Sequence, residues 1–306
     1  MRETLVSYAF LLPAMLFFVL FVLVPMGMGV VTSFFRYNMK GMTFTGLSNY
    51  MTMFADPVWQ KSLVNTLLLV VGSVPITVLF ALFVAAMTYE KNPFTRSFFR
   101  CVFFLPVVTG TVAVTVVWKW IYDPLNGILN WILKSQDLIE KNIMWTGDKR
   151  YALWAILIIL ITTSVGQPII LYIASLGNVP KDYVEAAQVD GANDFQEFWK
   201  IKWPSVMPTT LYVAIITTIK WPSLLPTTLY IVVITTINSF QCFSLIQLLT
   251  SGGPNYRTTT IMYYLYETAF KKFEYGYANA MGVILALIIG FISFVQFKAL
   301  GSDVEY

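Results

Sequence analysis

The sequence has 306 residues, of which 57% are hydrophobic and only 12% are charged. Soluble domains carry about 25% charged residues, so this chain has too little polar surface for a soluble globule and is predicted to be an integral membrane protein. The net charge of +4 comes from scattered basic residues, which argues against a nucleic-acid surface. The absence of histidine removes the commonest metal ligand and the commonest general base.

Six windows of the chain contain no acidic or basic residue and approach or exceed the length of a membrane span. A spanning helix needs about 20 predominantly apolar residues. One such window would also suit a buried helix of a soluble protein, but six of them favour a membrane protein. The first window is longer than the apolar region of a cleaved signal peptide, so it is predicted to be retained. The predicted spans are residues 7–35, 62–89, 99–122, 152–177, 223–250 and 276–298.

The basic residues of the loops leave the orientation open. The short loop after the second predicted span carries Lys91, Arg96 and Arg100, which is typical of a cytoplasmic loop. The next loop, residues 123–150, also carries four basic residues and would then be external. Charge alone therefore does not decide which side of the membrane each loop occupies.

Polar side chains inside the predicted spans are candidates for a substrate pathway. In lipid such groups are costly, and they usually face a protein interior or a water-filled cavity. Gln167 lies in the fourth span, whereas Asn238, Gln241 and Ser244 are expected on one helical face of the fifth, beside Phe243. Amides next to an aromatic ring suit the hydroxyls and the apolar ring face of a sugar. The alternative is hydrogen bonding between helices, which such side chains make routinely.

An island of charge lies between the fourth and fifth predicted spans. Residues 181–200 hold seven charged side chains, so this stretch belongs in water. Its pattern predicts two short helices separated by Gly191, which can end the first of them. The spacing is Glu185-Ala186-Ala187, three residues, Gly191, nine residues, then Ile201-Lys202-Trp203-Pro204.

This pattern resembles the EAA loop of permease subunits in binding-protein-dependent ABC importers, with Trp203 in place of the usual leucine. Other segments are similar to permeases of the carbohydrate-uptake type, so that the resemblance covers nearly the whole chain. These segments are Phe44–Tyr50, Leu249–Pro254, Tyr266–Phe270 and Gly276–Ala280.

The resemblance implies an all-α integral membrane protein with a single domain, residues 1–306. This domain would have the six transmembrane helices of the type I ABC importer permease fold. A cytoplasmic coupling helix is expected between spans four and five, in the loop 178–204, which fixes both termini in the cytoplasm. In that family the loop docks on the ATPase. The residues implied to couple are Glu185, Ala186, Ala187, Asp190, Gly191, Ile201 and Pro204.

The implied partners are a second permease subunit in a heterodimer, two ATPase subunits, an extracytoplasmic solute-binding protein, a sugar substrate and the lipid of a bacterial inner membrane. No cofactor is expected in this chain, because ATP and Mg²⁺ would bind to the ATPase subunits. The sequence has no P-loop of the G-x-x-x-x-G-K-[ST] type and no cysteine–histidine cluster, so the chain is predicted not to be an enzyme. The alternative class is a transporter driven by an ion gradient, which would be expected to hold ionisable residues inside its spans.

An 18-residue tandem repeat follows the charged island. Residues 201–218 read IKWPSVMPTTLYVAIITT and residues 219–236 read IKWPSLLPTTLYIVVITT, with 13 of 18 positions identical. The resembled family pattern needs this block once, and only the first copy has the correct spacing from Glu185. The repeat is either a genuine duplication that has drifted or an error in the recorded sequence, and the intact mass of the purified chain distinguishes the two.

Overall fold

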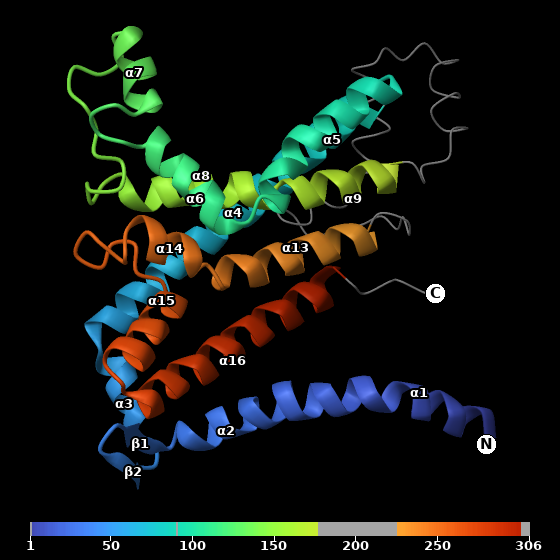
Figure 1. The fold of residues 1–306 in the computed structure, drawn as a ribbon, viewed down its shortest axis with the longest axis vertical. Coiled ribbons are helices and arrows are strands. Elements are labelled where there is room, and N and C mark those ends of the chain that lie inside the picture. The colour runs from blue at the N-terminus through green and yellow to red at the C-terminus, as the bar shows by residue number, and fades with distance from the viewer. Residues whose placement is uncertain (1, 90, 177–224, 301–306) are drawn as a thin grey trace. The chain divides into compact units, whose positions relative to one another are not determined.

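The structure is a computed structural model that describes residues 2–89, 91–176 and 225–300, and these residues are almost entirely helical (Figure 1). The predicted all-α fold class is confirmed, apart from one short β-hairpin. The coupling loop 178–204 and the first copy of the repeat lie outside the described residues. The chain divides into two compact units, Met1–Leu63 with Ile261–Ile288 and Val64–Thr260 with Ile289–Tyr306.

The first unit begins with a long apolar helical segment, from which Phe10–Thr32 could cross a membrane. Its side chains are exposed in the isolated chain, as expected for a segment that meets lipid or another subunit. The other elements of the unit are a hairpin, short helices and parts of two long helices. They are α1 (Arg2–Phe18), η1 (Val19–Leu23), α2 (Val24–Thr32), β1 (Phe35–Asn38), β2 (Gly41–Phe44), α3 (Ser48–Ala55), the start of α4 (Pro57–Tyr89), α15 (Ile261–Tyr266), η3 (Glu267–Lys271) and most of α16 (Tyr275–Leu300).

The hairpin begins at the last residue of the predicted span 7–35 and is held close to the start of α16. The Asn49 side-chain amide donates to the carbonyls of Ser33 and Phe35, at 2.7 and 2.9 Å. A Cβ atom on Gly276 would lie 1.9 Å from the carbonyl oxygen of Phe35, so only glycine allows this approach. The hairpin is therefore part of the packed unit.

The second unit contains the remaining helices. They are the rest of α4, α5 (Pro93–Val108), α6 (Thr111–Ile121), α7 (Ile128–Ser135), α8 (Ala152–Ser164), α9 (Gly166–Leu176), α13 (Leu225–Phe240), α14 (Ser244–Leu249) and the end of α16. One buried apolar cluster joins α4, α9 and α13, with Ala85, Ile169 and Ile231 among its most buried members. Close van der Waals packing of such side chains holds these helices together inside a membrane.

Hydroxyl groups connect α13 to both of its neighbours in this cluster. Ser73 on α4 and Ser239 on α13 share a hydrogen bond of 2.8 Å, and both side chains are fully buried. Ser175 on α9 donates to the hydroxyl of Thr227 on α13, also at 2.8 Å. Small polar side chains let helices approach closely inside a membrane. We call these four residues the α13 seam.

The number of membrane spans depends on two bent helix pairs. Within the described residues four helices are long and apolar enough to cross a membrane, or up to six if each bent pair is one span. The predicted span 99–122 is divided into α5 and α6, which meet at 101°. Gly110, with a φ of +78°, ends the helical path there, which hydropathy cannot reveal. The predicted span 152–177 is divided into α8 and α9, bent by 42°.

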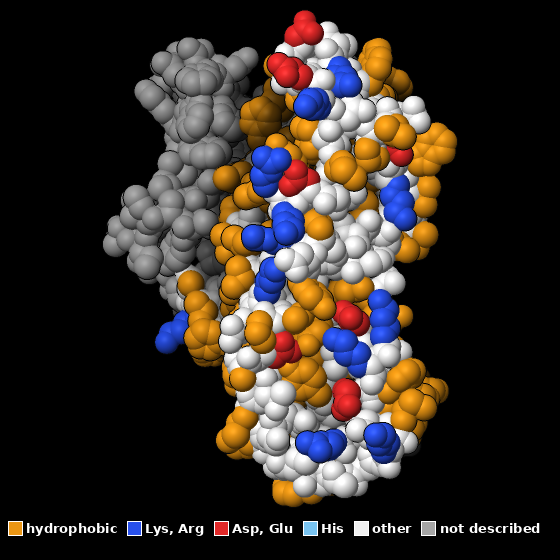
Figure 2. Space-filling view, turned by 90° about the vertical axis from the view of Figure 1, so that its left-hand side faces the viewer, with side chains coloured by type: hydrophobic (Ala, Val, Ile, Leu, Met, Phe, Trp, Pro, Cys, Tyr) orange, Lys and Arg blue, Asp and Glu red, His pale blue; other side chains and the backbone are white. Residues whose placement is uncertain are grey.

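The surface of the described residues is strongly apolar. Figure 2 shows hydrophobic side chains over much of one face, with acidic and basic side chains between them. Phe21 and Phe291, on helices long enough to span, are 70% and 68% exposed. Such surfaces are costly in water, so the structure agrees with the composition in placing this chain in a membrane.

Candidate substrate pathway

The expected ATPase-coupling residues lie outside the described residues. They are Glu185, Ala186, Ala187, Asp190, Gly191, Ile201 and Pro204. The five expected pathway residues are all described, and all belong to the second unit.

Four of the five expected pathway side chains are exposed in the isolated chain. Gln167 is the second residue of α9, Asn238 lies near the end of α13, and Gln241 directly follows that helix. Ser244 is the first residue of α14 and is also exposed, whereas Phe243 is half-buried. Polar groups left open in a membrane protein must meet water, substrate or another subunit.

The expected single helical face of the fifth span is broken after Phe240. Residues 241–243 leave the helix, and α14 resumes at Ser244. The freed carbonyl of Cys242 accepts a hydrogen bond of 3.0 Å from the buried hydroxyl of Thr260. A broken helix is tolerated at membrane depth where other groups satisfy its backbone. The break therefore changes the direction in which Gln241 and Ser244 leave the backbone relative to Asn238.

A second polar group lies just beyond this break. The side-chain oxygen of Gln247, on α14, is buried and has no hydrogen-bond partner among the described residues. Such a buried amide oxygen costs free energy unless another group reaches it. The sequence marks Gln247, like Gln241, as an amide in the apolar run of the fifth predicted span.

Gln167 is positioned by a close helix contact at its neighbour. A Cβ atom on Gly166 would lie 2.3 Å from the carbonyl oxygen of Phe103 and 2.9 Å from Cγ2 of Val107. Only glycine lets the start of α9 approach the backbone of α5 this closely. Gly166 follows Val165, where α8 and α9 bend, so the same point sets the direction of α9.

The α13 seam puts Gln167 and Asn238 at similar depth. In Figure 1, α13 begins at the end of the unit where α9 finishes, and the two helices run in opposite directions. From the contact of Ser175 with Thr227, Gln167 lies about 12 Å back along α9 at 1.5 Å per residue. Asn238 lies about 16 Å along α13 from the same contact. The seam thus brings both amides within about 5 Å in axial height.

The loop after α14 begins with Thr250–Pro254, from one of the segments similar to carbohydrate-uptake permeases, and is tied down by buried side chains. The Asn65 amide on α4 donates to the carbonyls of Tyr256 and Thr259, at 3.0 and 2.9 Å. The hydroxyl of Thr259 in turn donates to the Gly252 carbonyl at 2.9 Å. Buried carbonyls need such partners because water does not reach them. The sequence alone did not assign Asn65 this role, because its partners lie more than 190 positions away in the chain.

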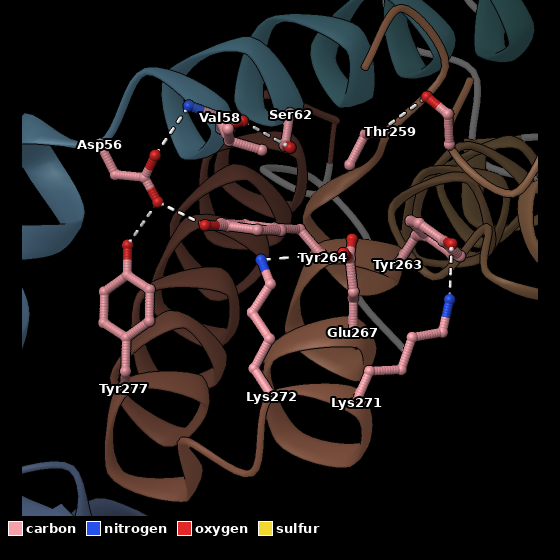
Figure 3. Close-up of polar contacts among 11 residues, drawn as sticks. Asp56, Val58, Ser62, Thr259, Tyr263, Tyr264, Glu267, Lys271, Lys272 and Tyr277 are labelled. Atoms are coloured by element: carbon pink, nitrogen blue, oxygen red, sulfur yellow. Dashed lines mark hydrogen bonds and ion pairs between the residues drawn. The ribbon is translucent and has the colours of Figure 1, made fainter. Parts of the chain in front are cut away.

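A half-buried carboxylate organises the first unit (Figure 3). Asp56 precedes α4, and one of its oxygens accepts from the backbone amide of Val58 at 2.8 Å, which caps the helix. The other oxygen accepts from the hydroxyls of Tyr264 and Tyr277, at 2.5 and 2.8 Å. Burial raises the pKa of Asp56, but these donors and the backbone amide of Trp59 outweigh it and lower the pKa below its usual value.

Two lysines lie over tyrosine rings at or beside this network. The ammonium group of Lys272 lies 4.8 Å from the centre of the Tyr264 ring and 3.7 Å from a carboxylate oxygen of Glu267. Lys271 is placed in the same way over Tyr263, at 5.4 Å. These exposed cation–π contacts and the ion pair are worth under about 1 kcal/mol each. The hydrogen bonds of Asp56 therefore contribute most of the stability of the network.

Residues 53–220 match the family described as the inner membrane component of binding-protein-dependent transport systems. The chain belongs to this family. This permease is 33% identical to the probable ABC transporter permease protein YurN of Bacillus subtilis, over 97% of this chain and 96% of that protein. It is 31% identical to the multiple sugar-binding transport system permease protein MsmF of Streptococcus mutans, over 95% of this chain and 94% of that protein.

The permease also has the fold of a solved transporter. A crystal structure of a bacterial ABC transporter involved in the import of the acidic polysaccharide alginate matches with a TM-score of 0.76. The match covers 99% of this chain and 98% of that one, at 22% identity, and it therefore supports the fold alone.

The family assignment confirms the resemblance drawn from the sequence. The chain is the membrane permease subunit of an ABC importer and is not itself the ATPase. This finding decides between the two transporter classes, in favour of the importer over a transporter driven by an ion gradient. Among the described residues, no group of three or more cysteine, aspartate or glutamate side chains is placed to hold a metal ion.

Proposed function

We propose that this permease forms the translocation pathway for a sugar or oligosaccharide and is driven by ATPase subunits through its loop 178–204. The observation that carries the sugar assignment is the match over 95% of the chain to MsmF, whose name records multiple sugar-binding transport. The exposed amides of Gln167, Asn238 and Gln241 support it, because neutral amides both donate to and accept from sugar hydroxyls.

Coupling is assigned to the EAA motif within the charged island. Glu185 would make a polar contact on the ATPase subunit, and Gly191 would end the first helix of the loop. ATPase closure would then move spans four and five, which this loop connects. In this arrangement residues 178–204 and both chain termini would lie in the cytoplasm. A second permease subunit would complete the pathway, and a solute-binding protein would deliver the sugar from outside.

The coupling assignment is tested on the assembled transporter. Glu185→Ala and Gly191→Pro are each compared with Glu197→Ala, which removes an acidic residue of the same island outside the motif. We expect both motif variants to lose ATP-driven uptake and to retain less ATPase subunit on purification, whereas Glu197→Ala keeps both. Normal uptake and normal co-purification in both motif variants would refute the assignment.

The substrate assignment is tested on the solute-binding protein that serves this permease. A thermal-shift screen against neutral oligosaccharides, acidic oligosaccharides, amino acids and phosphate esters separates the main classes. We expect the transition temperature to rise with a neutral sugar. A rise only with a compound that is not a carbohydrate would refute the sugar assignment and leave the coupling assignment intact.

A further inference from the structure

The tandem repeat raises the question of which copy forms the helix beside the candidate pathway. Residues 225–236 of the second copy form most of α13, and the first copy lies outside the described residues. The two copies are identical at the positions that make hydrogen bonds in α13. Thr209 corresponds to Thr227, and Thr218 corresponds to Thr236, which accepts from Gln296 at 2.9 Å. The hydrogen bonds inside the repeat therefore do not distinguish the copies.

Side-chain volume inside the repeat favours the second copy. Ile231 and Val232 are buried in the cluster shared by α4, α9 and α13, where they are 1% and 6% exposed. The first copy has the smaller Val213 and Ala214 at these positions. Placing the first copy against α9 would leave unfilled volume at both sites, which close-packed interiors do not tolerate without loss.

The residues that follow each copy decide the choice. After the second copy come Ser239, which is bonded to Ser73, and Phe240, which is fully buried. After the first copy, the corresponding positions hold Trp221 and Pro222. A tryptophan does not fit where a buried serine hydroxyl meets another at 2.8 Å, and a proline cannot donate its backbone amide to the helix.

We propose that the second copy alone supplies the helix that faces α9. The hydrogen bond between Ser239 and Ser73 then acts as a lock that holds this copy, and not the first, against its neighbours. An 18-residue shift would put Lys220 where Asn238 lies and Ser223 where Gln241 lies. The lock therefore places two amides, instead of a lysine and a serine, in the pathway. The consequence for transport rests on the proposed function, but the register itself does not. The first copy then supplies only the Ile201–Pro204 end of the coupling motif.

Engineered cysteine pairs test directly, in the full-length chain, which copy of the repeat faces α9. Cys101 and Cys242 are the only native cysteines, so Cys101→Ala with Cys242→Ala gives a clean background. Ser175→Cys is combined with Thr227→Cys or, as the matched control, with Thr209→Cys. The hydroxyl oxygens of Ser175 and Thr227 are 2.8 Å apart, a spacing compatible with the Cβ separations of about 3.5–4.5 Å that disulfides span.

Trypsin then separates the two registers by mass. Peptide 151–181 becomes linked to peptide 221–257 if the second copy faces α9, and to peptide 203–220 if the first copy does. We expect linkage at residue 227 to exceed linkage at residue 209 by at least tenfold, in purified permease with no substrate or nucleotide. Equal or greater linkage at residue 209 would overturn the proposal. Absence of linkage at residue 227 in a variant that melts like its parent would overturn it as well.

A second pair checks the lock itself. In the same background, Ser73→Cys is combined with Ser239→Cys or with Trp221→Cys. Linkage of peptide 62–91 to peptide 221–257 supports the proposal if only the Ser239→Cys variant gives it. If the Trp221→Cys variant links to an equal extent, the proposal is wrong. This pair lies at the other end of α13, so it remains informative if the first pair does not fold. Neither readout requires transport, so a failure of the register is distinguishable from a failure of the proposed function.

Discussion

The Asp56 carboxylate and the Tyr264 hydroxyl lie 2.5 Å apart although 208 residues separate them along the chain. Together with Tyr277, this contact ties the segment before α4 to α15 and α16 within the first unit. The same carboxylate caps α4 through the amide of Val58. One side chain therefore fixes three helices.

Removing either tyrosine hydroxyl should destabilise the permease. Hydrogen bonds to a charged group are worth about 1.5–3 kcal/mol, so Tyr264→Phe and Tyr277→Phe should each lower the apparent Tm by several degrees in detergent. Tyr230→Phe, at a tyrosine that is 47% exposed, is the matched control and should leave the Tm unchanged. Combination of either variant with Asp56→Ala should be less than additive, since both remove the same contact.

The same network makes a pH dependence with a definite sign. The pKa of Asp56 is lowered in the folded protein, so its contribution is complete above the unfolded value of about 3.9 and is lost as pH falls through the lower folded value. Asp56→Asn removes this titration. The Tm difference between the parent and Asp56→Asn should be constant from about pH 5 to 8 and should shrink below about pH 4. A difference that grows on acidification would contradict the assignment.

Because α9 approaches α5 closely at Gly166, alanine should be destabilising there but not at an uncrowded glycine. Gly166→Ala places a Cβ atom against the Phe103 backbone, so α5 and α9 must separate, at a cost of about 1–3 kcal/mol. Gly290→Ala is the control, because no atom beyond the adjacent backbone of α16 lies within 4 Å of the added Cβ. In a thermal melt, Gly166→Ala should lower the Tm and Gly290→Ala should hold or raise it. Equal melts would show that α9 does not approach α5 this closely.

Replacing Asn65 should destabilise the loop after α14, because its one amide group serves two carbonyls. Asn65→Leu leaves the carbonyls of Tyr256 and Thr259 without this donor, at about 1–3 kcal/mol each. We expect a lower Tm and faster proteolysis after Arg257. Asn126→Leu, at an exposed asparagine in the loop before α7, is the comparison and should have little effect. Unchanged proteolysis in Asn65→Leu would remove the claim that this amide orders the loop.

The pathway residues should affect transport and leave stability alone. Asn238 and Gln241 are exposed, so Asn238→Leu and Gln241→Leu should keep the parent Tm. Each loses hydrogen bonds to substrate worth about 0.5–1.5 kcal/mol, which corresponds to roughly a two- to tenfold lower uptake at limiting sugar. Leu287→Ala, at a 63% exposed side chain of α16, controls for a change of the apolar surface. A loss of Tm that parallels the loss of uptake would instead assign these amides to helix packing.

Hydropathy predicted the helical membrane class because a lipid-facing helix needs only an apolar composition, which a single sequence displays. It could not predict the division of residues 99–122 at Gly110, since the bend depends on one φ angle. The Asp56 network and the α13 seam could not be predicted from the sequence either, because they join residues far apart in the chain. The amides of Asn238 and Gln241 were found from sequence as polar groups in an apolar run. The single helical face predicted for them was wrong, because the helix ends at Phe240 and resumes only at Ser244.

The central claim is that this chain is the pathway subunit of an ATP-driven sugar importer. The direct test is ATP hydrolysis by the complete transporter in proteoliposomes, with its solute-binding protein added with and without the sugar found in the thermal-shift screen. We predict that hydrolysis rises when the sugar-loaded binding protein is present, and that labelled sugar accumulates in step with it. Accumulation that follows an imposed ion gradient without ATP, with no stimulation of hydrolysis by the loaded binding protein, would contradict the account.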